Sequence, residues 1–519
     1  MEKDKMLRQG KKKLFGLVFG RSAVIILLLI LQVVILAGVL LYFSEYIGYY
    51  YWLSIIVSVV VIIYVMNRPD NPAFTLSWII PILVIPVFGA LLYVFLHLQI
   101  GTRIIYDRHR KLIGKTRLYL QQQPEVLEAL EKEDVYEAAL ARYMAKCGGY
   151  PVYRNSSVKY FSCGEEKFAE MIPRLEKAKK FIFLEYFIIE EGVMLNTVLD
   201  ILERKVKEGV DVRFMYDGMC SIALVPWNFP KELERRGITC RVFSPVRPAL
   251  STSQNNRDHR KVLVVDGEVA FTGGINLADE YINLKERFGY WKDVAVMVEG
   301  EAVTAFTMMF LQMWGIEKME DELYRDFCTP QSPAAESPGY VMPYGDSPLD
   351  RETVGEQVYM DMLYHATRYV HIMTPYLILD AEMTNALTHA ARSGKEVIII
   401  MPGIPDKPYA FILAKTYYPE LLRAGVKIYE YTPGFVHAKV FVSDDCRAVV
   451  GTINLDFRSL YLHFECAAYM YQVEAVRDIE ADFQETLAKC HQVTVEDCRK
   501  LPVMKKIFGR CLRILAPLM

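Results

Sequence analysis

"HRKVLVVDGEVAFTGGIN", residues 259–276, places His259 and Lys261 two positions apart, before four aliphatic residues that end at Asp266. In a β-strand, residues two positions apart point to the same face, so these two basic side chains are expected to emerge together. The aliphatic residues would anchor the strand in the interior. An imidazole beside an ammonium group at the mouth of a buried strand predicts a site for an anion.

The same pattern occurs again in "HAKVFVSDDCRAVVGTIN", residues 437–454. Five positions recur at identical spacings: His259 and His437, Lys261 and Lys439, Asp266 and Asp444, Gly273 and Gly451, and Asn276 and Asn454. Chance does not repeat five positions in register, so the chain contains an internal duplication.

The repeat extends upstream of both motifs. Residues 179–189 match residues 368–378, and residues 209–217 match residues 394–402; each is a β-rich run within a pattern that alternates strands and helices. Such alternation is typical of α/β units, and it predicts a largely parallel sheet in each half. We therefore predict an α/β fold whose two repeats pack as a pseudo-twofold, bilobal catalytic region.

Composition indicates the boundaries of these parts. We predict a membrane-anchoring region at 1–118, a first repeat at 119–328 and a second repeat at 340–519, joined by the Pro-, Ser- and Ala-rich linker 329–339. The tail 505–519 carries basic and apolar residues at helical intervals. It either lies on a bilayer or docks against the catalytic region, and the pattern does not separate these alternatives.

Hydrophobic residues make up 52% of the chain, more than in most soluble proteins. Segments 22–43 and 46–66 contain no charged residue, and each approaches the roughly 20 residues that cross a bilayer. We expect both to be transmembrane helices. A third apolar segment, 73–98, is interrupted by Pro81 and Pro86, which either kink a spanning helix or turn a re-entrant hairpin back.

Positive charge indicates the topology. Seven Lys and Arg residues precede residue 22, and six lie in 103–117. The positive-inside rule puts both clusters in the cytoplasm, and three full crossings would separate them. Two crossings followed by a re-entrant third segment are therefore the favoured arrangement, with the catalytic region in the cytosol.

Cysteine usage favours the same compartment. The ten cysteines occur singly, without a C-x-x-C pair. This distribution suits a reducing environment. We expect no metal site, no cofactor and no redox role for these thiols.

If the two motifs meet, the site holds two histidines, two lysines and two asparagines. Two ammonium groups repel each other unless an anion lies between them, and a phosphodiester meets that requirement. One imidazole would attack phosphorus and form a phosphohistidine, while the other protonates the departing oxygen. Lys261, Lys439, Asn276 and Asn454 would stabilise charge on the non-bridging oxygens.

The motif glycines and aspartates have supporting roles in this scheme. Gly273, Gly274 and Gly451 would let backbone N–H groups approach the phosphate. Asp266 and Asp444 belong to the repeated catalytic motif, but they lie seven residues after the histidines and hence on the opposite strand face. We expect them to support the fold of the site rather than its chemistry.

The doubled His-x-Lys-x4-Asp motif resembles the signature of the phospholipase D superfamily. The resemblance extends to the bacterial cardiolipin synthases and covers nearly the whole chain. It is carried by the N-terminal apolar hairpin, the two motif stretches, "YWKD" at 290–293, "TPYLILDAEM" at 374–383, "GTINLDFRSLYLHFE" at 451–465 and the closing "RCLRILAPLM".

This resemblance implies two phospholipase D-like repeats behind N-terminal transmembrane helices, at the plasma membrane of a bacterium. It implies transfer of a phosphatidyl group from one phosphatidylglycerol to another, giving cardiolipin and glycerol, with His259 as the nucleophile. The family's orienting acid falls on Glu465, a comparable residue in the first half is Asp293, and Thr452 joins the phosphate-binding set. His463 stands where the family has asparagine, and Lys292 where it has arginine, which puts headgroup selectivity in doubt.

Other function classes are weighed against this one. A hydrolase on the same scaffold would use water, and a related transferase would use a different acceptor alcohol. A nuclease is disfavoured by the apolar segments and by the lack of interleaved aromatic and basic residues, so nucleic acid is not an expected partner. An inactive scaffold is disfavoured because every polar motif residue is duplicated. The expected partners are phosphatidylglycerol and the bilayer, and the sequence does not define an oligomeric state.

Overall fold

The computed structural model describes residues 47–97, 100–245, 255–319, 323–328 and 337–518, together with residues 30, 34 and 38. The chain forms two compact units. The smaller comprises 1–104, 246–255 and 514–519, and the larger comprises 105–245 and 256–513.

Helices α3 (Ile47–Met66), α4 (Pro72–Val84) and α5 (Pro86–His97) make up most of the described part of the smaller unit. The chain folds back between α4 and α5, because Pro86 cannot continue the preceding helix. A Cβ atom on Gly89 would lie 2.6 Å from the carbonyl oxygen of Pro81, so the turn requires glycine there. The rings of Trp78 and Tyr93 then meet across the hairpin, with centroids 5.4 Å apart.

These helices bear on the predicted membrane segments. Segment 22–43 lies outside the described residues apart from residues 30, 34 and 38, and segment 46–66 corresponds to α3 from residue 47 onward. Segment 73–98 forms two helices instead of one. In the part of the chain that the structure describes, no helix meets both the length and the apolar character required to cross a membrane. The two crossings stay predictions.

The larger unit begins with α6 (Ile100–Thr116, from residue 105), α7 (Pro124–Glu133) and α8 (Val135–Tyr143). The first repeat has a sheet with strand order β1-β9-β7-β6-β2-β3-β4. Its strands are β1 Ser156–Phe161, β2 Phe181–Tyr186, β3 Asp211–Asp217, β4 Thr239–Phe243, β6 Lys261–Val265, β7 Val269–Gly273 and β9 Ala295–Gly300. Its helices are α9 Gly164–Lys177, α10 Val193–Lys207, α11 Cys220–Ala223, α12 Phe229–Arg235 and α13 Val303–Glu317.

The second repeat has a sheet with strand order β10-β17-β16-β15-β11-β12-β13-β18. Its strands are β10 Tyr340–Asp346, β11 Tyr369–Met373, β12 Glu396–Pro402, β13 Lys427–Tyr431, β15 Val440–Ser443, β16 Arg447–Gly451, β17 His463–Tyr471 and β18 Cys490–Val493. Its helices are α14 Val354–His365, α15 Ala381–Arg392, α16 Pro408–Ala414, α17 Tyr418–Ala424, α18 Ala475–Leu487, α19 Val495–Lys500 and α20 Val503–Leu515.

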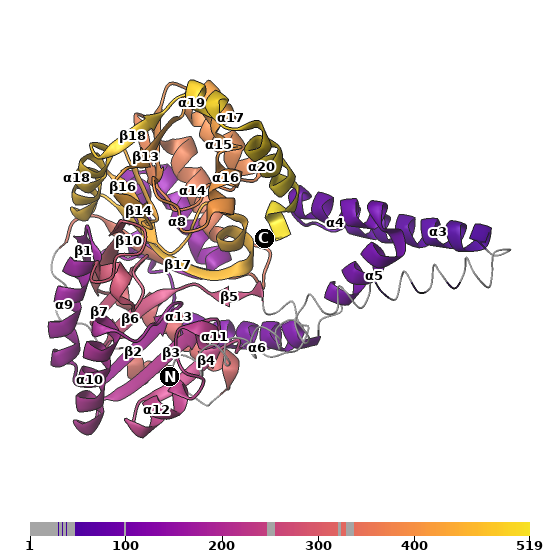
Figure 1. The fold of residues 1–519 in the computed structure, drawn as a ribbon. Coiled ribbons are helices and arrows are strands. Elements are labelled where there is room, and N and C mark those ends of the chain that lie inside the picture. Colours follow the sequence, from indigo (N-terminus) through magenta and orange to yellow (C-terminus); the bar gives the residue numbers. More distant parts are fainter. Residues whose placement is uncertain are drawn as a thin grey trace. The chain divides into compact units, whose positions relative to one another are not determined.

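The two sheets confirm the predicted duplication. Strands β10, β17, β16, β15, β11, β12 and β13 take the places of β1, β9, β7, β6, β2, β3 and β4. Strand β7 contacts β16 and β17, so the sheets meet at their motif strands. In Figure 1 the first repeat, in violet to pink, adjoins the second, in orange and yellow.

The prediction of a largely parallel sheet is wrong. Along the first sheet β2, β3 and β4 pair in parallel, as β11, β12 and β13 do in the second, while β2-β6-β7-β9-β1 is antiparallel throughout. The reason lies in the motif itself. Three residues join β6 to β7, and Asp266 and Gly267 there have positive φ. A connection this short makes a hairpin, because a parallel pair needs a crossover of about a dozen residues or more.

Helix α13 is the centre of the core. Nearly every residue between Val303 and Ile316 is buried, so this helix is apolar all round rather than amphipathic. It packs against β2, β4, β6 and β7 of the first sheet and against β10 of the second. The motif strands of the first repeat therefore pack against a buried helix.

Candidate active site

His259 lies at a junction between the two repeats. The short strand β5 (Arg257–Asp258) leaves its own sheet and pairs in parallel with β17 of the second repeat. The backbone N–H of His259 continues this pairing by donating to the carbonyl of Phe464 at 2.9 Å. Strand β6 then begins at Lys261 in the first sheet. His259 is thus fixed by both repeats at once.

His437 has the reciprocal arrangement. Strand β14 (Gly434–Val436) pairs in parallel with β8 (Tyr290–Lys292) of the first repeat. The backbone N–H of His437 donates to the carbonyl of Lys292 at 2.7 Å. Each motif histidine therefore follows a short strand that pairs with a strand of the opposite repeat.

Each imidazole is held by a carboxylate from the other repeat. Nδ1 of His259 contacts the two carboxylate oxygens of Glu465 at 2.9 and 3.0 Å, and Nδ1 of His437 contacts Asp293 at 2.6 Å. Glu465 follows Phe464 and Asp293 follows Lys292, so the strand pairing that fixes each backbone also delivers the acid. An ionised acid accepts a hydrogen bond from Nδ1–H, which leaves Nε2 of each ring for a substrate.

The side chain of Glu465 is longer than that of Asp293, and the residues beside the two acids differ accordingly. The hydroxyl of Thr452 donates to Glu465. At the matching position of the first repeat, a Cβ atom on Gly274 would lie 2.0 Å from a carboxylate oxygen of Asp293. The shorter acid thus needs glycine beside it, while the longer one leaves room for threonine. Gly274 and Thr452, predicted to bind phosphate, contact the acids instead.

The motif lysines lie beside the histidines and are buried. The ammonium group of Lys261 donates to the backbone carbonyl of His259, and that of Lys439 to the carbonyl of His437. Burial lowers the pKa of Lys261 to about 8 and that of Lys439 to about 7. The positive charge of Lys261 also lowers the pKa of His437, so charges of one repeat act on groups of the other.

Burial keeps the imidazoles neutral. It holds the pKa of His259 well below the usual value and, with the charge of Lys439, lowers that of His437 to about 4. Although burial opposes ionisation of the acids, the pKa of Glu465 and that of Asp293 lie below their usual range because the histidine partners stabilise the carboxylates. Near neutral pH the site therefore combines neutral rings with charged acids.

The asparagines and the other glycines do not share one role. The side chain of Asn276 accepts from the backbone N–H of Ile188 at 2.9 Å and donates to the hydroxyl of Tyr281 at 2.8 Å. The side-chain oxygen of Asn454 is buried and has no hydrogen-bond partner among the described residues. Asn276 is thus engaged by protein, and Asn454 is the better candidate for a substrate contact.

Gly273 and Gly451 allow close strand packing. A Cβ atom on Gly273 would meet the carbonyl oxygen of Val294 at 2.4 Å, and Gly273 has φ +147. One on Gly451 would meet the Cβ of Ala467 at 2.3 Å. These glycines bring the motif hairpin against β9 and β17, the strands next to the acids.

Grouping Asp266 and Asp444 with the catalytic residues is not supported by their position. Asp266 follows the last residue of β6, at the opposite end from His259, and accepts from the backbone N–H groups of residues 179–181 at 2.7–2.9 Å. Asp444 accepts from those of residues 367–369 in the same way. Both fix the start of the neighbouring antiparallel strand, β2 or β11, at the strand end away from the histidine.

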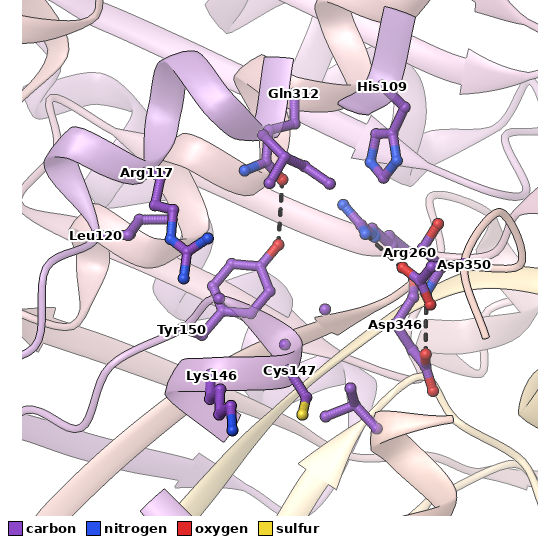
Figure 2. A pocket seen from close by; sticks show the side chains of 16 residues that line it. His109, Arg117, Leu120, Lys146, Cys147, Tyr150, Arg260, Gln312, Asp346 and Asp350 are labelled. Carbon is purple, nitrogen blue, oxygen red and sulfur yellow. Dashed lines mark hydrogen bonds between the residues drawn. The ribbon is translucent and has the colours of Figure 1, made fainter. Parts of the chain in front are cut away.

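Arg260 anchors the site from behind. It is 1% exposed, and its Nε donates to the backbone carbonyl of Glu465 at 3.1 Å. Its side chain points into a cavity of about 100 Å³ on the far side of the motif, where Figure 2 also shows His109 and Asp346. In the sequence, Arg260 lies between His259 and Lys261 at a position that the second motif does not repeat. The comparison of the motifs therefore does not reveal its role.

Two further lysines are buried, Lys167 and Lys292. The sequence predicts no role for the first and identifies the second only as a departure from the family pattern. Lys167 in α9 is buried, donates to the carbonyl of Ile275 at 3.3 Å and has a pKa lowered to about 7 by burial. It lies far upstream of the motif and carries no spacing signal. Lys292, a departure from the family pattern, donates to both carboxylate oxygens of Asp482 at 2.6 and 2.8 Å. The carboxylate of Asp482 therefore balances its positive charge.

His463, the other departure, lies next to His259. Its ring centroid lies 5.5 Å from that of His259, and neither of its nitrogens has a hydrogen-bond partner among the described residues. Potential ligand atoms of His259, His463 and Glu465 lie within 4.8 Å of one another. Two imidazoles and a carboxylate suit zinc, but His259 and Glu465 are already hydrogen-bonded to each other, so a metal would have to displace that contact.

Comparison with known proteins identifies the family of the chain. A family model described as "Cardiolipin synthase, PLD-like domain" matches residues 171–314 and 359–487, and one described as "Phospholipase_D-nuclease N-terminal" matches residues 53–96. An uncharacterized protein of Streptococcus mutans is 52% identical over 457 residues, covering 88% of this chain and 99% of that protein. The cardiolipin synthase of Alkalihalophilus pseudofirmus is 34% identical, covering 88% and 91%.

A solved structure shares the fold. The phosphatidylserine synthase of Haemophilus influenzae superposes with a TM-score of 0.54 at 13% identity, covering 70% of this chain and 93% of that chain. Two α/β repeats that exchange His–acid pairs define a phosphatidyltransferase of the phospholipase D superfamily. Within that superfamily, the chain belongs to the bacterial cardiolipin synthase family.

Replacing Asp266 by alanine is expected to weaken the fold rather than the chemistry. Three backbone N–H groups would lose their acceptor, which we expect to lower the free energy of unfolding by roughly 3 kcal/mol. Chemical denaturation measures this loss, with the exposed neighbour Glu268→Ala as the control. Loss of turnover per folded molecule at unchanged stability would return Asp266 to the chemistry.

The alkaline side of the pH profile tests the lysines. Raising pH through about 7 to 8 removes the positive charge of Lys439 and Lys261, so kcat/KM for a phosphodiester substrate is expected to fall over that range. Arginine keeps its charge, so Lys439→Arg should move this limb upward even if the overall rate is lower. A profile of kcat/KM that stays flat through pH 9 would contradict these assignments.

Proposed function

We propose that this enzyme transfers a phosphatidyl group from one phosphatidylglycerol to a hydroxyl of another, producing cardiolipin and releasing glycerol. The observation that carries the proposal is the pair of buried imidazoles, each held through Nδ1 by a carboxylate of the opposite repeat. Membership of the cardiolipin synthase family supports the choice of substrate.

In the first step, Nε2 of His259 attacks phosphorus, and the bond from phosphorus to the glycerol oxygen breaks. His437 donates a proton to that oxygen, so that neutral glycerol leaves. Burial and the charge of Lys439 lower the pKa of His437 to about 4, and a phosphate anion beside the ring would raise that pKa, so that His437 could carry the proton that it donates. Glu465 keeps the Nδ1 proton on His259, which stabilises the phosphohistidine that forms.

In the second step, the now neutral His437 accepts a proton from the hydroxyl of a second phosphatidylglycerol. That oxygen attacks phosphorus, the bond from phosphorus to Nε2 of His259 breaks, and cardiolipin leaves. The enzyme returns to its starting protonation state. Because the repeats are nearly symmetric, the choice of His259 as nucleophile follows the family resemblance and not a difference in geometry.

The lysines stabilise the negative charge that spreads over the non-bridging oxygens. Each ammonium group has three donors and uses one on a backbone carbonyl, so donors remain for phosphate. Both side chains are 1% exposed, and a charge interaction is stronger in such a dry site than in water. An anion between them would relieve their mutual repulsion.

We also propose that residues 1–118 hold the enzyme at the bacterial plasma membrane, with 22–43 and 46–66 as crossings and the catalytic repeats in the cytosol. Helix α3 supports a lipid environment, because Trp52, Ile56 and Val60 are all more than half exposed. All ten cysteines lie within the described residues and are free, as suits a reducing compartment.

Substituting either motif histidine tests the mechanism. His259→Ala and His437→Ala are each expected to lower turnover of phosphatidylglycerol in detergent micelles by at least about 10³-fold, because the first variant lacks the proposed nucleophile and the second lacks the proposed proton donor. The exposed His491→Ala serves as the matched control. Substantial activity in either motif variant would rule out the two-histidine mechanism, and mass spectrometry of a trapped phosphoryl adduct on His437 would reverse the roles.

The products decide between transfer and hydrolysis. With phosphatidylglycerol as the sole lipid, thin-layer chromatography is expected to show cardiolipin, with one glycerol released for each molecule formed. The inactive His259→Ala enzyme gives the background. Phosphatidic acid as the main product would instead identify a hydrolase, in which water reaches the phosphohistidine before the second lipid.

A further inference from the structure

Helix α20 presents an apolar face to solvent. Val503, Met504, Ile507 and Phe508 are between 50% and 74% exposed. These positions are spaced by one, four and five residues, so they share one face of the helix. A soluble surface rarely leaves such a row uncovered, and the row therefore indicates a binding surface.

The opposite face of α20 is docked on the second repeat. A Cβ atom on Gly509 would lie 2.7 Å from a methyl group of Thr416 and 3.1 Å from the carbonyl oxygen of Ile412. Glycine at 509 thus lets the helix backbone approach α16 closely. Because the helix is seated by this side, its apolar row is directed outward.

A basic cavity adjoins the same helix. It has a volume of about 390 Å³ and lies between α20, α19 and the segment 412–423. Among the described residues that line it, Glu420 is acidic and seven are basic: Lys415, Arg423, Arg499, Lys505, Lys506, Arg510 and Arg513. The whole chain has a net charge of −2, so this concentration of positive charge is local.

Nearby acids offset only part of this charge. Arg513 lies 3.7 Å from Glu420, Lys415 lies 3.3 Å from Glu430, and Arg499 lies 3.5 Å from Glu496. Lys506 donates to a backbone carbonyl, that of Arg499, at 2.7 Å. Three acids against seven basic groups leave an excess of positive charge at the rim of the apolar row.

We propose that α20 lies in the headgroup layer of a membrane rich in anionic phospholipid, with its apolar row in the acyl region and a lipid phosphate in the basic cavity. None of the motif residues lines this cavity, so the lipid would be a docking lipid and not the reacting one. A bilayer with anionic headgroups can bind both the apolar row and the basic residues of α20. An acidic protein surface would bind only the basic residues. The proposal does not require the reaction proposed above.

Hydrogen exchange measured on the full chain tests this docking. In nanodiscs of phosphatidylcholine mixed with phosphatidylserine, peptides spanning 503–513 are expected to exchange at least about fivefold more slowly than in phosphatidylcholine alone, given the gain per basic residue near an anionic surface. Phosphatidylserine supplies negative charge without the glycerol headgroup of the proposed substrate. Equal exchange in the two nanodiscs would overturn the proposal, and the same protection from inorganic phosphate with phosphatidylcholine would identify a free-anion site instead.

Matched variants separate charge from fold. Lys505→Gln with Arg510→Gln should abolish most of the protection, and Phe508→Ser should weaken it without changing the cavity. The control pair Lys207→Gln and Arg235→Gln removes two exposed basic groups of the first repeat, each 70% exposed, and should leave the protection intact. Protection that survives the α20 charge variant, or that is lost in the control pair, would contradict a specific docking role.

Discussion

The site depends on two short parallel strand pairings that cross between the repeats. Strand β5 binds β17 and strand β14 binds β8, and each pairing ends where a histidine of one repeat meets the acid of the other. Neither repeat alone would hold a complete His–acid pair. The interface between the repeats is therefore a part of the chemistry, and a shift of one strand register would turn each acid away from its histidine.

The same crossing explains the electrostatics. Two lysines, two imidazoles and two carboxylates are buried together, and burial disfavours every charged form among them. The carboxylates stay ionised because the histidines donate to them, while the lysine pKa values fall toward neutrality. A phosphate between the ammonium groups would supply the negative charge that balances them, which is why the proposed substrate is an anion.

The repeats are symmetric in backbone but not in side chains. Trp291 and His463 occupy matching positions two residues before the acids, and their rings lie 5.5 Å from His437 and His259 respectively. Asn276 is bound by protein atoms, whereas the oxygen of Asn454 is unpaired among the described residues. These differences give the two histidines different surroundings, which a division of roles between nucleophile and proton donor requires.

The sequence alone determined the duplication, the His–Lys pairs and the α/β class, because local spacing and strand periodicity encode them. Strand-face alternation also placed Asp266 and Asp444 away from the histidines, although the motif groups them with the catalytic residues. Only the tertiary structure decided which acid serves which histidine, that the sheets are mixed, and that Gly274, Thr452 and Lys292 contact carboxylates. The His–acid pairs and the contact of Lys292 with Asp482 join segments more than a hundred residues apart, such as His259 with Glu465, and no local pattern records such a pairing.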